Sequence, residues 1–462
     1  MPNGDSPASE SPVMASVIDD LAWSEGRRRK ALIVVLACLW AGAAPHWLGP
    51  VRGLLPAFGL TLMLGGYGFS TLRRGRSSAA VTSAAPSADG VVPAIDVLVA
   101  ARDEEQVIAR LVQAIAGLDY PADRLKLWVM DDGSQDRTPE ILKQLSETHP
   151  FLQVRRRPRN AGGGKSGALN ALLPQLQGDW LLVLDADAAL TPDVLLRLQP
   201  QLNDSALGAV QLRKAVVGAD SNWLTRSQAL EMAFDAEMQL GRIAQGGIGE
   251  LRGNGQLIRR QVLLDCGGFN EDTVTDDLDL SFRLLLAGQQ VSVLWNPVVD
   301  EEPVMRWGAL WRQRQRWAEG GLQRFLDYWP SLFSDRLSGR QQLDLIVFFL
   351  LQYGLPLATV GDVFGMIWWR QWPLLWPLSV STLSLSALAL WRSGRRSSEG
   401  PELPAASGWN LLVANTYLIH WFLVIPWVAV RMALRPKRLV WAKTVHAGLS
   451  VSRDRKSTRL NS

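Results

Sequence analysis

The stretch Trp180-Leu181-Leu182-Val183-Leu184-Asp185-Ala186-Asp187 decides how the middle of this chain is expected to fold. Its five consecutive apolar residues predict a short strand that is buried on both faces of a sheet. Similar apolar runs at residues 95–100 and 125–130 are each followed by a helical pattern, at residues 104–118 and 139–148. Strands that alternate with helices predict an α/β fold with a mostly parallel, doubly wound sheet.

Two aspartates, Asp185 and Asp187, follow the strand directly. Ligands of doubly wound sheets bind at the carboxyl ends of the strands. Carboxylates at positions i and i+2 point to the same side of a strand, and hard oxygen ligands of this kind suit Mg²⁺, or Mn²⁺, carrying a diphosphate. The pair therefore predicts a metal–diphosphate site. The alternative is a solvated cap before the turn at Thr191-Pro192.

A second acidic pair, Asp131-Asp132, follows the strand at residues 125–130. A carboxylate there can accept a hydrogen bond from a uracil N–H group. The alternative is a turn that caps the next helix.

The glycine-rich segment Gly162-Gly163-Gly164-Lys165-Ser166 departs from the P-loop pattern, because Arg159 stands where that pattern requires glycine. A P-loop is therefore rejected. Lys165 and the backbone N–H groups around it still favour the oxygens of a diphosphate.

The segment Thr275-Asp276-Asp277-Leu278-Asp279 leads into an amphipathic helix predicted at residues 278–286. One interpretation is a helix cap formed by Thr275 or Asp276. The other is an acidic cluster, completed by Asp279, in which like charges raise the pKa of one carboxyl as a general base requires. Asp277 is the predicted base.

The segment Gln313-Arg314-Gln315-Arg316-Trp317 has a helical pattern that places Gln313, Arg316 and Trp317 on one face. Trp317 offers a flat surface next to a sugar, and Arg316 can meet a diphosphate. The alternative is an interfacial helix with its tryptophans at the lipid headgroups and its arginines on lipid phosphates.

Apolar runs at residues 31–47 and 54–72 approach the length that crosses a hydrocarbon core of about 30 Å. Basic clusters at residues 27–30 and 73–76 lie on their outer flanks and predict a membrane hairpin with both ends in the cytoplasm. The alternative is a pair of buried core helices.

Three more apolar runs follow, at residues 345–369, 373–391 and 409–434, and they contain Asp362 and His420. We expect Asp362 to face protein or water, because a charge within the bilayer is costly. Basic clusters flank both ends of the last run, so one of these segments is expected to be re-entrant or to lie along the membrane surface.

The composition of the chain argues against several classes of protein. A net charge of +4 gives no sign of nucleic-acid binding, four His residues without ligand spacing make a zinc site improbable, and Cys38 and Cys266 predict no disulfide framework. The final residues 454–462 match a translated sequencing adapter and are excluded from fold reasoning.

The predicted divisions of the chain are a disordered tail (1–26), a transmembrane hairpin (27–76), a linker (77–93), a catalytic domain (94–330), interfacial and transmembrane helices (331–444) and a C-terminal tail (445–462).

Taken together, these motifs resemble the family 2 glycosyltransferases with a GT-A fold, whose pattern is Asp, Asp-x-Asp, Thr-Glu-Asp and Gln-x-x-Arg-Trp. The third motif is Thr275-Asp276-Asp277 here, which departs at its middle residue and keeps the expected base. The resemblance covers residues 94–325. It implies an α/β fold in which a GT-A Rossmann-like doubly wound sheet is inserted between transmembrane helices.

Within that family, residues 162–170, 246–256, 275–280 and 316–321 resemble the cyanobacterial membrane enzymes that make β-monoglucosyldiacylglycerol. The likeness implies UDP-glucose as donor, 1,2-diacylglycerol as acceptor, Mg²⁺ or Mn²⁺ as cofactor, and inversion at the anomeric carbon. It also implies an integral multi-pass protein with a cytoplasmic catalytic domain. The alternatives are a processive polysaccharide synthase of the cellulose, chitin or hyaluronan type, a ceramide-type lipid glucosyltransferase, and an inactive scaffold that binds nucleotide-sugar.

The resemblance also assigns roles by position. Glu104 and Asp132 are expected to contact the nucleoside, with Asp131 and Ala101 beside them. The family usually has Pro-Thr-x-Asn-Glu where this chain has Ala100-Ala101-Arg102-Asp103-Glu104, so a contact at Ala101 is made through the backbone or lost. The remaining assignments are Lys165, Asp185 and Asp187 for the diphosphate and the metal, Asp277 for deprotonating the acceptor hydroxyl, and Gln313, Arg316 and Trp317 bordering the diphosphate and the acceptor.

Overall fold

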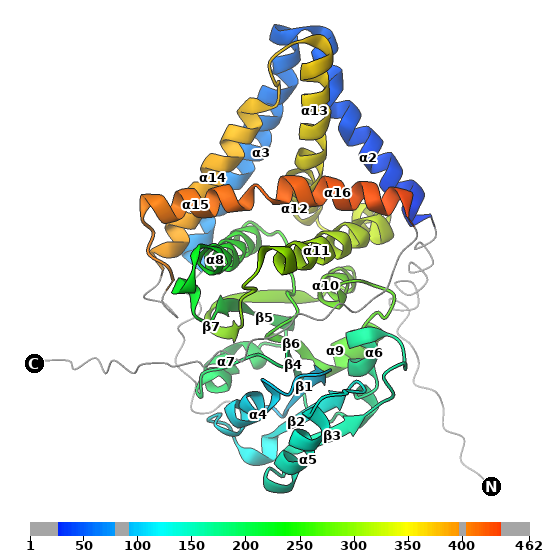
Figure 1. Cartoon of the computed structure of the whole chain (residues 1–462), viewed down its shortest axis with the longest axis vertical. Helices are drawn as coiled ribbons and strands as arrows, with labels where there is room; N and C mark the ends of the chain where they lie inside the picture. The colour runs from blue at the N-terminus through cyan, green and yellow to red at the C-terminus, as the bar shows by residue number, and fades with distance from the viewer. Residues whose placement is uncertain (1–25, 79–91, 397–402, 436–462) are drawn as a thin grey trace, which may run out of the picture.

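A computed structural model describes residues 26–78, 92–396 and 403–435 of the chain, with the side chains of residues 76–78 left out. The predicted N-terminal tail, most of the predicted linker and the C-terminal tail with its adapter-like end lie outside the described residues. The described part consists of a sheet domain, a layer of helices above it, and a cone of helices that rises from this layer (Figure 1).

The sheet domain is built on seven strands: β1 (Ile95–Ala101), β2 (Leu125–Asp131), β3 (Leu152–Arg156), β4 (Trp180–Leu184), β5 (Leu207–Val216), β6 (Gln256–Arg259) and β7 (Gln290–Glu301). Their order in the sheet is β3-β2-β1-β4-β6-β5-β7. Neighbouring strands are parallel except at β6, which is antiparallel to both β4 and β5. The sheet is therefore mixed, and mostly parallel as predicted.

Both faces of the sheet are covered, which explains the continuous apolar strands. Along β1, Val97 and Val99 pack into one core while Leu98 and Ala100 pack into another, because side chains alternate between the two faces of a strand. The first core contains side chains of α4 (Ile108–Ala116), α5 (Thr138–Thr148) and α7 (Val194–Leu202), and the second contains those of α6 (Gly164–Asn170), α9 (Arg260–Asp265) and α10 (Asp276–Leu286).

The antiparallel strand β6 brings a connecting segment over the functional edge of the sheet. Because β6 runs against β4, residues 245–255 before it must approach from the carboxyl end of β4. There the N–H of Gly255 donates to Val183 O at 3.0 Å, and the N–H of Asp185 donates to Asn254 Oδ1 at 3.1 Å. The segment at residues 246–256 thus lies beside the Asp185–Asp187 motif.

Two long helices, α8 (Trp223–Ala244) and α11 (Trp307–Tyr328), lie between the sheet and the cone (Figure 1). The cone consists of α2 (Arg27–Ala43), α3 (Pro50–Ser78), α13 (Leu355–Trp369) and α14 (Trp376–Gly394), with α12 (Gly339–Phe349) leading into α13 through the π-helical turn η8 (Leu350–Gly354). The last two helices, α15 (Gly408–Leu418) and α16 (Trp421–Leu434), lie across the base of the cone. Short 3₁₀ helices are η2 (Ala44–Leu48), η4 (Ala122–Arg124), η5 (Leu173–Gln175), η6 (Ala219–Ser221) and η7 (Ser331–Phe333).

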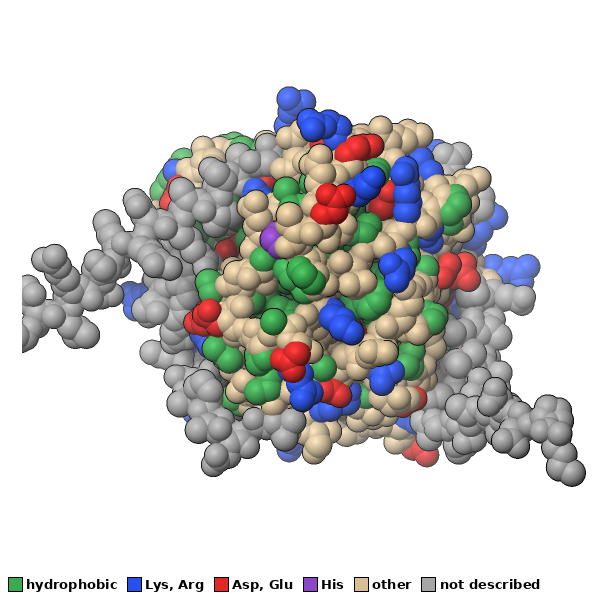
Figure 2. Space-filling model, turned by 90° about the horizontal axis from the view of Figure 1, so that it is seen from below, with side chains coloured by type: hydrophobic (Ala, Val, Ile, Leu, Met, Phe, Trp, Pro, Cys, Tyr) green, Lys and Arg blue, Asp and Glu red, His purple; other side chains and the backbone are tan. Residues whose placement is uncertain are grey.

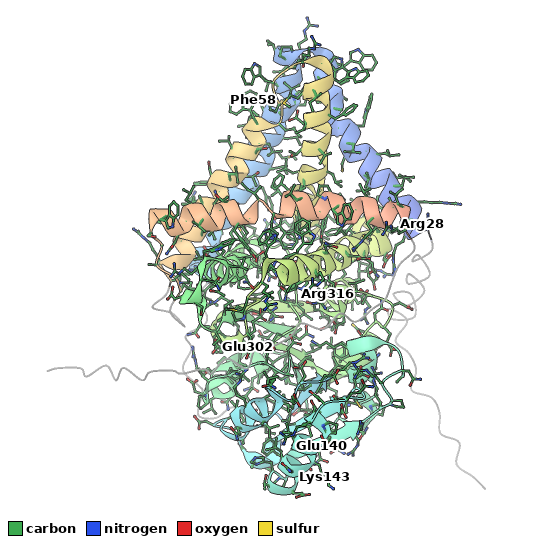
Figure 3. All side chains as sticks on the ribbon, in the orientation of Figure 1. Arg28, Phe58, Glu140, Lys143, Glu302 and Arg316 are labelled. Atoms are coloured by element: carbon green, nitrogen blue, oxygen red, sulfur yellow. The ribbon has the colours of Figure 1, made fainter. Side chains whose placement is uncertain are left out.

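Four helical stretches among the described residues are long and apolar enough to cross a membrane: Arg27–Leu48, Pro50–Gly75, Gly339–Trp369 and Gly408–Leu434. Large apolar side chains on the cone point outward, as Ile33 (66% exposed) and Leu62 (77% exposed) do. Phe58 lies on this surface, whereas Glu140 and Lys143 lie at the opposite end of the molecule (Figure 3). The face at this lower end of the molecule carries acidic and basic side chains intermixed, as is typical of a surface in water (Figure 2).

Asp362 faces protein, one of the two surroundings predicted for it. The side chain is 2% exposed. Its Oδ1 accepts a hydrogen bond from the Leu374 N–H at 2.8 Å and lies 2.8 Å from Nε2 of His46. The Leu375 N–H donates to Oδ2 at 3.2 Å. Asp362 therefore ties η2 to the segment that begins α14, near the tip of the cone.

Candidate active site

The Asp185–Asp187 motif lies at the carboxyl end of β4, where the strand ends and the chain turns. Lys165 Nζ, at the start of α6, donates to Asp185 Oδ1 at 2.5 Å. Burial lowers the pKa of Lys165, but the charges of Asp185 and Asp276 outweigh it and raise the pKa above its usual value. The Glu302 N–H donates to Asp187 Oδ2 at 3.0 Å. The structure thus brings together the three residues predicted for a diphosphate and a metal.

The two aspartates differ in exposure, and this bears on the ion that they could hold. The Asp185 side chain is 42% exposed, whereas Asp187 is buried. The described residues contain no group of three or more His, Cys, Asp and Glu side chains that could hold a metal alone. Mg²⁺ is commonly bound by one or two carboxylates together with substrate phosphates. The motif therefore fits a cation that arrives with a diphosphate.

The carboxylate of Asp131 is bound by residues next to it in the fold. Its Oδ1 accepts a hydrogen bond from the Ser134 N–H at 2.9 Å, and its Oδ2 lies 3.1 Å from Arg156 Nε. These contacts form a turn, as in the alternative interpretation of the Asp131-Asp132 pair, but the N-cap position of the next helix, α5, is Arg137 and neither aspartate caps it.

Asp132 is buried at the end of β2, beside the end of β1. Its Oδ1 accepts from Arg157 Nε at 2.5 Å and its Oδ2 from Arg102 Nη1 at 3.4 Å. Its N–H donates to the carbonyl of Ala101 at 2.8 Å. Glu104 is also buried, and its N–H donates to Thr138 Oγ1 at 2.8 Å. Ala101 and Asp132 thus meet at one edge of the sheet. The carbonyl of Ala101 already accepts a hydrogen bond from the Asp132 N–H.

Asp277 lies in the first turn of α10. Thr275 precedes that helix, and its side chain makes no capping hydrogen bond. Burial, reinforced by the neighbouring charge of Asp276, raises the pKa of Asp277 to about 6, against the opposing effects of the Leu278 N–H, Lys214 and Lys165. A carboxylate with a pKa in this range can accept a proton near neutral pH. The raised pKa suits the predicted base, and Thr275 does not act as a side-chain cap.

The predicted source of that pKa shift was wrong in one respect. Asp279 does not join an acidic cluster with Asp277, because its Oδ2 pairs with Arg283 Nε at 2.8 Å. Its Oδ1 accepts from Asn270 and Tyr328, each at 3.0 Å. The like charge that acts on Asp277 is Asp276.

A cation that the sequence analysis did not single out, Lys214 of β5, completes this side of the site. Its Nζ lies 3.0 Å from Glu301 Oε2 and 5.2 Å from the centre of the Trp317 ring. Burial lowers the pKa of Lys214, but Glu301 and Asp185 raise it by more. Two consecutive cations, Arg213-Lys214, in an otherwise mostly apolar strand were the available signal.

Helix α11 carries the Gln313–Trp317 segment past the site. Burial lowers the pKa of Arg316, against the attraction of Asp185 and Asp277, so Arg316 lies within electrostatic reach of both motifs. Gln313 Oε1 accepts a hydrogen bond from Arg314 at 2.7 Å. Arg314, which was given no role, is fully buried and stacks over the Trp317 ring at 4.0 Å.

Arg314 also fixes α11 to its neighbours. Its Nη2 pairs with Glu231 of α8, and Glu231 in turn accepts hydrogen bonds from Tyr417 at 2.8 Å and from Trp421 Nε1 at 2.9 Å. Glu231 therefore connects α8, α11 and the helices α15 and α16 at one point. Trp317 is held against this connection.

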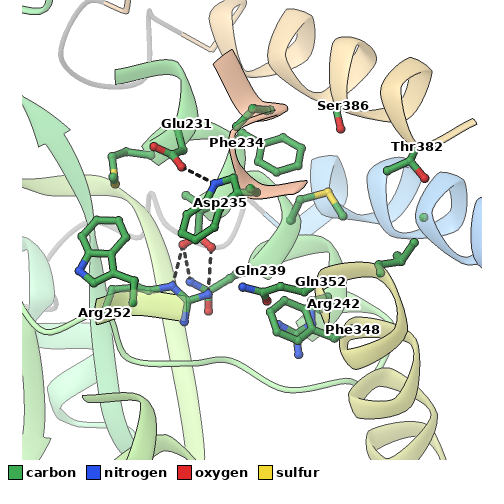
Figure 4. A pocket seen from close by; sticks show the side chains of 18 of the residues that line it. Glu231, Phe234, Asp235, Gln239, Arg242, Arg252, Phe348, Gln352, Thr382 and Ser386 are labelled. Atoms are coloured by element: carbon green, nitrogen blue, oxygen red, sulfur yellow. Dashed lines mark hydrogen bonds and ion pairs between the residues drawn. The ribbon is translucent and has the colours of Figure 1, made fainter. Parts of the chain in front are cut away.

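A second network of charged residues supports the segment before β6. Arg252 pairs with Asp235 at 2.9 Å (Figure 4). Arg252 also pairs with the buried Glu250 at 3.2 Å, and Glu250 pairs with Arg242 at 3.1 Å. The next residue, Gly253, has φ +84°, and a Cβ there would lie 3.3 Å from Asp277 Oδ2. The glycine lets the backbone pass close to the base.

A cavity of ≈ 410 Å³ extends from these polar groups into the base of the cone. At its polar end it is lined by Asp277, Lys214 and Trp317. Its far wall is mostly apolar and comes from the cone and from the helices across its base: Leu64 of α3, Leu383 and Leu385 of α14, and Phe422 and Ile425 of α16. Ser386 and Thr382 of α14 also face it (Figure 4). The arrangement can place an apolar molecule with one polar end beside Asp277.

Comparisons with known proteins agree with this geometry. Residues 93–320 match the family described as glycosyltransferase like family 2. The chain is 44% identical over 429 residues to a β-monoglucosyldiacylglycerol synthase of Synechocystis sp., covering 92% of this chain and 89% of that protein. It is 41% identical over 433 residues to the β-monoglucosyldiacylglycerol synthase of Trichormus variabilis, covering 92% and 90%.

Among solved structures, the mannosyltransferase PcManGT of Pyrobaculum calidifontis, in complex with GDP-Man and Mn²⁺, aligns with a TM-score of 0.53 at 21% identity, covering 82% of this chain and 98% of that one. This likeness supports the fold, in which a Rossmann-like mixed sheet lies among apolar helices. The motifs, the topology and the extent of these matches lead to one conclusion: the chain is a glycosyltransferase of family 2 and belongs with the β-monoglucosyldiacylglycerol synthases.

Proposed function

We propose that this protein transfers glucose from UDP-glucose to the free hydroxyl of 1,2-diacylglycerol and forms β-monoglucosyldiacylglycerol. The observation that carries the proposal is the cavity, because it joins Asp277, Lys214 and Trp317 to apolar residues of helices that could lie in a membrane. Diacylglycerol has this character, with one hydroxyl at the end of a molecule that stays in the bilayer. The names of the relatives at 44% and 41% identity support the same reaction.

The chemical step is a single displacement at the anomeric carbon. The ionised Asp277 accepts the proton of the lipid hydroxyl as its oxygen forms a bond to C1 of glucose. The bond from C1 to the diphosphate oxygen breaks on the opposite face of the sugar, and its electron pair leaves with UDP. One base and one displacement convert the α linkage of the donor into a β linkage in the product.

We propose that several cationic groups stabilise the negative charge that develops on the leaving diphosphate. Lys165 lies against Asp185, and Lys214 and Arg316 lie within electrostatic reach of it. Asp185 and Asp187 would hold Mg²⁺ or Mn²⁺, and such an ion neutralises charge on a departing diphosphate. On the nucleoside side, Asp132, Glu104 and Ala101 are proposed to bind uridine, with Asp131 shaping the turn beside them.

Trp317 is proposed to form the wall on which the glucose ring rests, between the donor and the acceptor. It lines the cavity and is fixed by the stacked Arg314, which itself is held by Glu231. Gln313 would act through Arg314, which donates to its side-chain oxygen.

We further propose that α2–α3 and α13–α14 are two membrane hairpins, although α14 is not among the four stretches that are long and apolar enough to cross, and that the sheet domain lies in the cytoplasm. Both hairpins begin and end at the base of the cone, where Arg28 is seen (Figure 3). The helices carry more basic residues at this end than at the tip, as expected for a cytoplasmic side. The basic residues of the base include Arg27, Arg28, Arg29, Lys30, Arg73, Arg74, Arg392 and Arg395, and those of the tip are Arg52 and Arg370.

This topology accounts for the conflicting charges around the last apolar run. Although residues 408–434 are apolar enough to span, α15 and α16 lie across the base, with a break between them at Ile419-His420. Basic residues at both ends of a helix pair that lies along the surface are then on the same side of the membrane. The surface-lying segment expected from the sequence is thus assigned to α15–α16.

The test is an assay of the full chain, purified in detergent, with radiolabelled UDP-glucose and dioleoylglycerol. We expect label in the lipid extract, one hexose per lipid by mass, a β linkage by NMR, and UDP release that Asp277→Asn abolishes. A ladder of sugars would identify a polysaccharide synthase instead, and ceramide as the better acceptor a ceramide-type enzyme. A product with an α linkage would overturn the displacement mechanism, and UDP release unchanged by Asp277→Asn would overturn the role of the base.

A further inference from the structure

The last apolar run of the chain contains one charged side chain within its helices, Arg431. It is the only Asp, Glu, Lys or Arg residue at positions 409–434. A charge within an apolar segment is costly unless it is paired or reaches water, so such a residue calls for a functional explanation. One explanation is a contact with lipid phosphates, which an arginine at a membrane surface can make. The contacts of Arg431 within the protein support a different one.

Arg431 lies on the side of α16 that faces the protein. The opposite side of this helix exposes Leu423 and Trp427. Val424 and Val428 are buried and belong to the same apolar core as side chains of α11. Arg431 follows these two valines with the spacing of a single helical face. One side of α16, which lies across the base of the cone (Figure 1), is thus available to lipid, and the other packs on α11.

The guanidinium of Arg431 joins α16 to two residues of α11. Its Nη1 donates to Gln315 Oε1 at 2.9 Å, and its Nη2 pairs with the carboxylate of Glu319. Gln315 and Glu319 are about one helical turn apart, so the guanidinium holds that turn at both ends. The side chains of Arg431 and Glu319 are 29% and 18% exposed, and water therefore screens this pair less than it screens a pair on an open surface.

The turn of α11 that is held in this way carries two residues of the proposed donor site, Arg316 and Trp317. Trp317 lines the cavity, and its ring lies 4.0 Å from the guanidinium of Arg314. Arg316 lies within electrostatic reach of Asp185 and Asp277. Both side chains start from the backbone of the same turn, so a rotation or shift of that turn would move both of them relative to the donor.

The connection at Glu231 does not replace the contact made by Arg431. Trp421, at the start of α16, donates to Glu231, which pairs with Arg314. Arg431 follows Trp421 by ten residues, which is about 15 Å along a helix. Two attachments this far apart fix the angle between α16 and α11, whereas a single one would let α11 pivot.

We propose that Arg431 is a positioning residue for the donor side of the reaction. From a helix whose other side is available to lipid, it fixes the turn of α11 that carries Arg316 and Trp317. This inference rests on the proposed function, in which these two residues meet the diphosphate and the sugar of UDP-glucose. Arg431 acts through α11 and not by contact with a substrate.

The test measures initial rates of the full chain in dioleoylphosphatidylcholine vesicles that contain dioleoylglycerol, with each substrate varied in turn. Arg431→Met keeps an unbranched apolar stem and removes the guanidinium. We expect it to raise the KM for UDP-glucose and to lower kcat, each by about three- to tenfold, and to leave the KM for dioleoylglycerol within about twofold. Arg435→Met is the matched control, because Arg435 is the exposed C-cap residue of the same helix, and it should change no constant by more than about twofold.

Charge reversal separates a specific pairing from a general weakening of the fold. Arg431→Glu and Glu319→Arg should each lower kcat/KM for UDP-glucose by about tenfold or more, because like charges then face each other. The double variant restores an ion pair in the opposite order, and the carboxamide of Gln315 can turn to donate to the new carboxylate. We expect its kcat/KM to return to within about threefold of the wild-type value.

Each result decides the role of Arg431. Rates of Arg431→Met within twofold of the wild type would overturn it, and so would a lower kcat with both KM values unchanged, which indicates only fewer folded molecules. A double variant no more active than the single variants would exclude the pairing with Glu319. A wild type that transfers no glucose to a glycerolipid would instead overturn the proposed function, and the same comparison with the sugar and acceptor that it does use would still decide whether Arg431 positions α11.

Discussion

The carboxyl end of β4 and the cavity below the cone are two halves of one site that differ in construction. At the end of β4, Asp185 and Asp187 stand two residues apart, and Lys165 reaches Asp185 from a nearby helix. The cavity instead combines residues from α3, α10, α14 and α16, which are spread over most of the described chain. A charged donor needs a few fixed cations and carboxylates, whereas a lipid needs an enclosed apolar wall, which only the assembled fold provides.

The largest effect is expected from disabling Asp277, the group at which the two halves of the site meet. Asp277→Asn keeps the shape of the side chain and removes its ability to accept a proton. We expect kcat to fall by about 10²–10⁴-fold. Binding of UDP-glucose, followed by calorimetry, should be retained, and an activity within tenfold of the wild type would exclude Asp277 as the base.

The donor half is tested by Asp185→Asn and Asp187→Asn. Loss of either carboxylate weakens the site for a divalent cation, so kcat/KM should fall by about 10²–10³-fold and respond less to added Mg²⁺ or Mn²⁺. Asp193→Asn is the matched control, because that residue lies beyond the same strand in a partly exposed position. If the control lost as much activity as the two variants, the motif would have no special role.

The acceptor half is tested by filling the cavity. Ser386→Trp places a large ring in the wall formed by α14, and it should raise the KM for dioleoylglycerol by about tenfold while leaving the KM for UDP-glucose unchanged. Ser384 lies on the exposed side of the same helix, so Ser384→Trp should alter neither constant. A rise in the KM for UDP-glucose alone would show that the cavity serves the donor.

The smallest expected effect concerns pH. Because burial and Asp276 raise the pKa of Asp277 to about 6, the base is ionised and active above that pH and protonated below it. The kcat/KM should therefore rise with pH through about 6 and level off, being about tenfold lower at pH 5 than at pH 8. Asp276→Asn removes the neighbouring negative charge and should move the midpoint to lower pH. A flat profile between pH 5 and pH 8 would contradict a titrating base.

Much of the donor half of the site could be predicted from the sequence, because its residues lie at the ends of strands and helices. Apolar strands ending in Asp131-Asp132 and Asp185-Ala186-Asp187 predicted both the α/β sheet and the edge where these side chains gather. The predicted place of Asp279 in an acidic cluster with Asp277 was wrong. The sequence contained the reason, because Arg283 lies four residues later on the same helix and pairs with Asp279. The only sequence signal for Lys214 was the pair Arg213-Lys214 within a mostly apolar strand, which does not by itself indicate a site.

The acceptor half had no comparable pattern. Leu64, Leu383 and Phe422 resemble every other apolar residue of their helices, and only the way the helices pack shows that they share a cavity. The same holds for α15–α16, whose composition suggests a span and whose packing places them across the base.

The position of the cavity at the base of the cone also has a consequence for the asymmetry of the bilayer. In the proposed topology the hydroxyl is glycosylated at the leaflet next to the sheet domain. The new glucose headgroup carries several hydroxyls, and moving each of them through hydrocarbon without a partner is unfavourable. The product therefore accumulates in the leaflet where it was made, and its transfer to the opposite leaflet requires a separate translocation step.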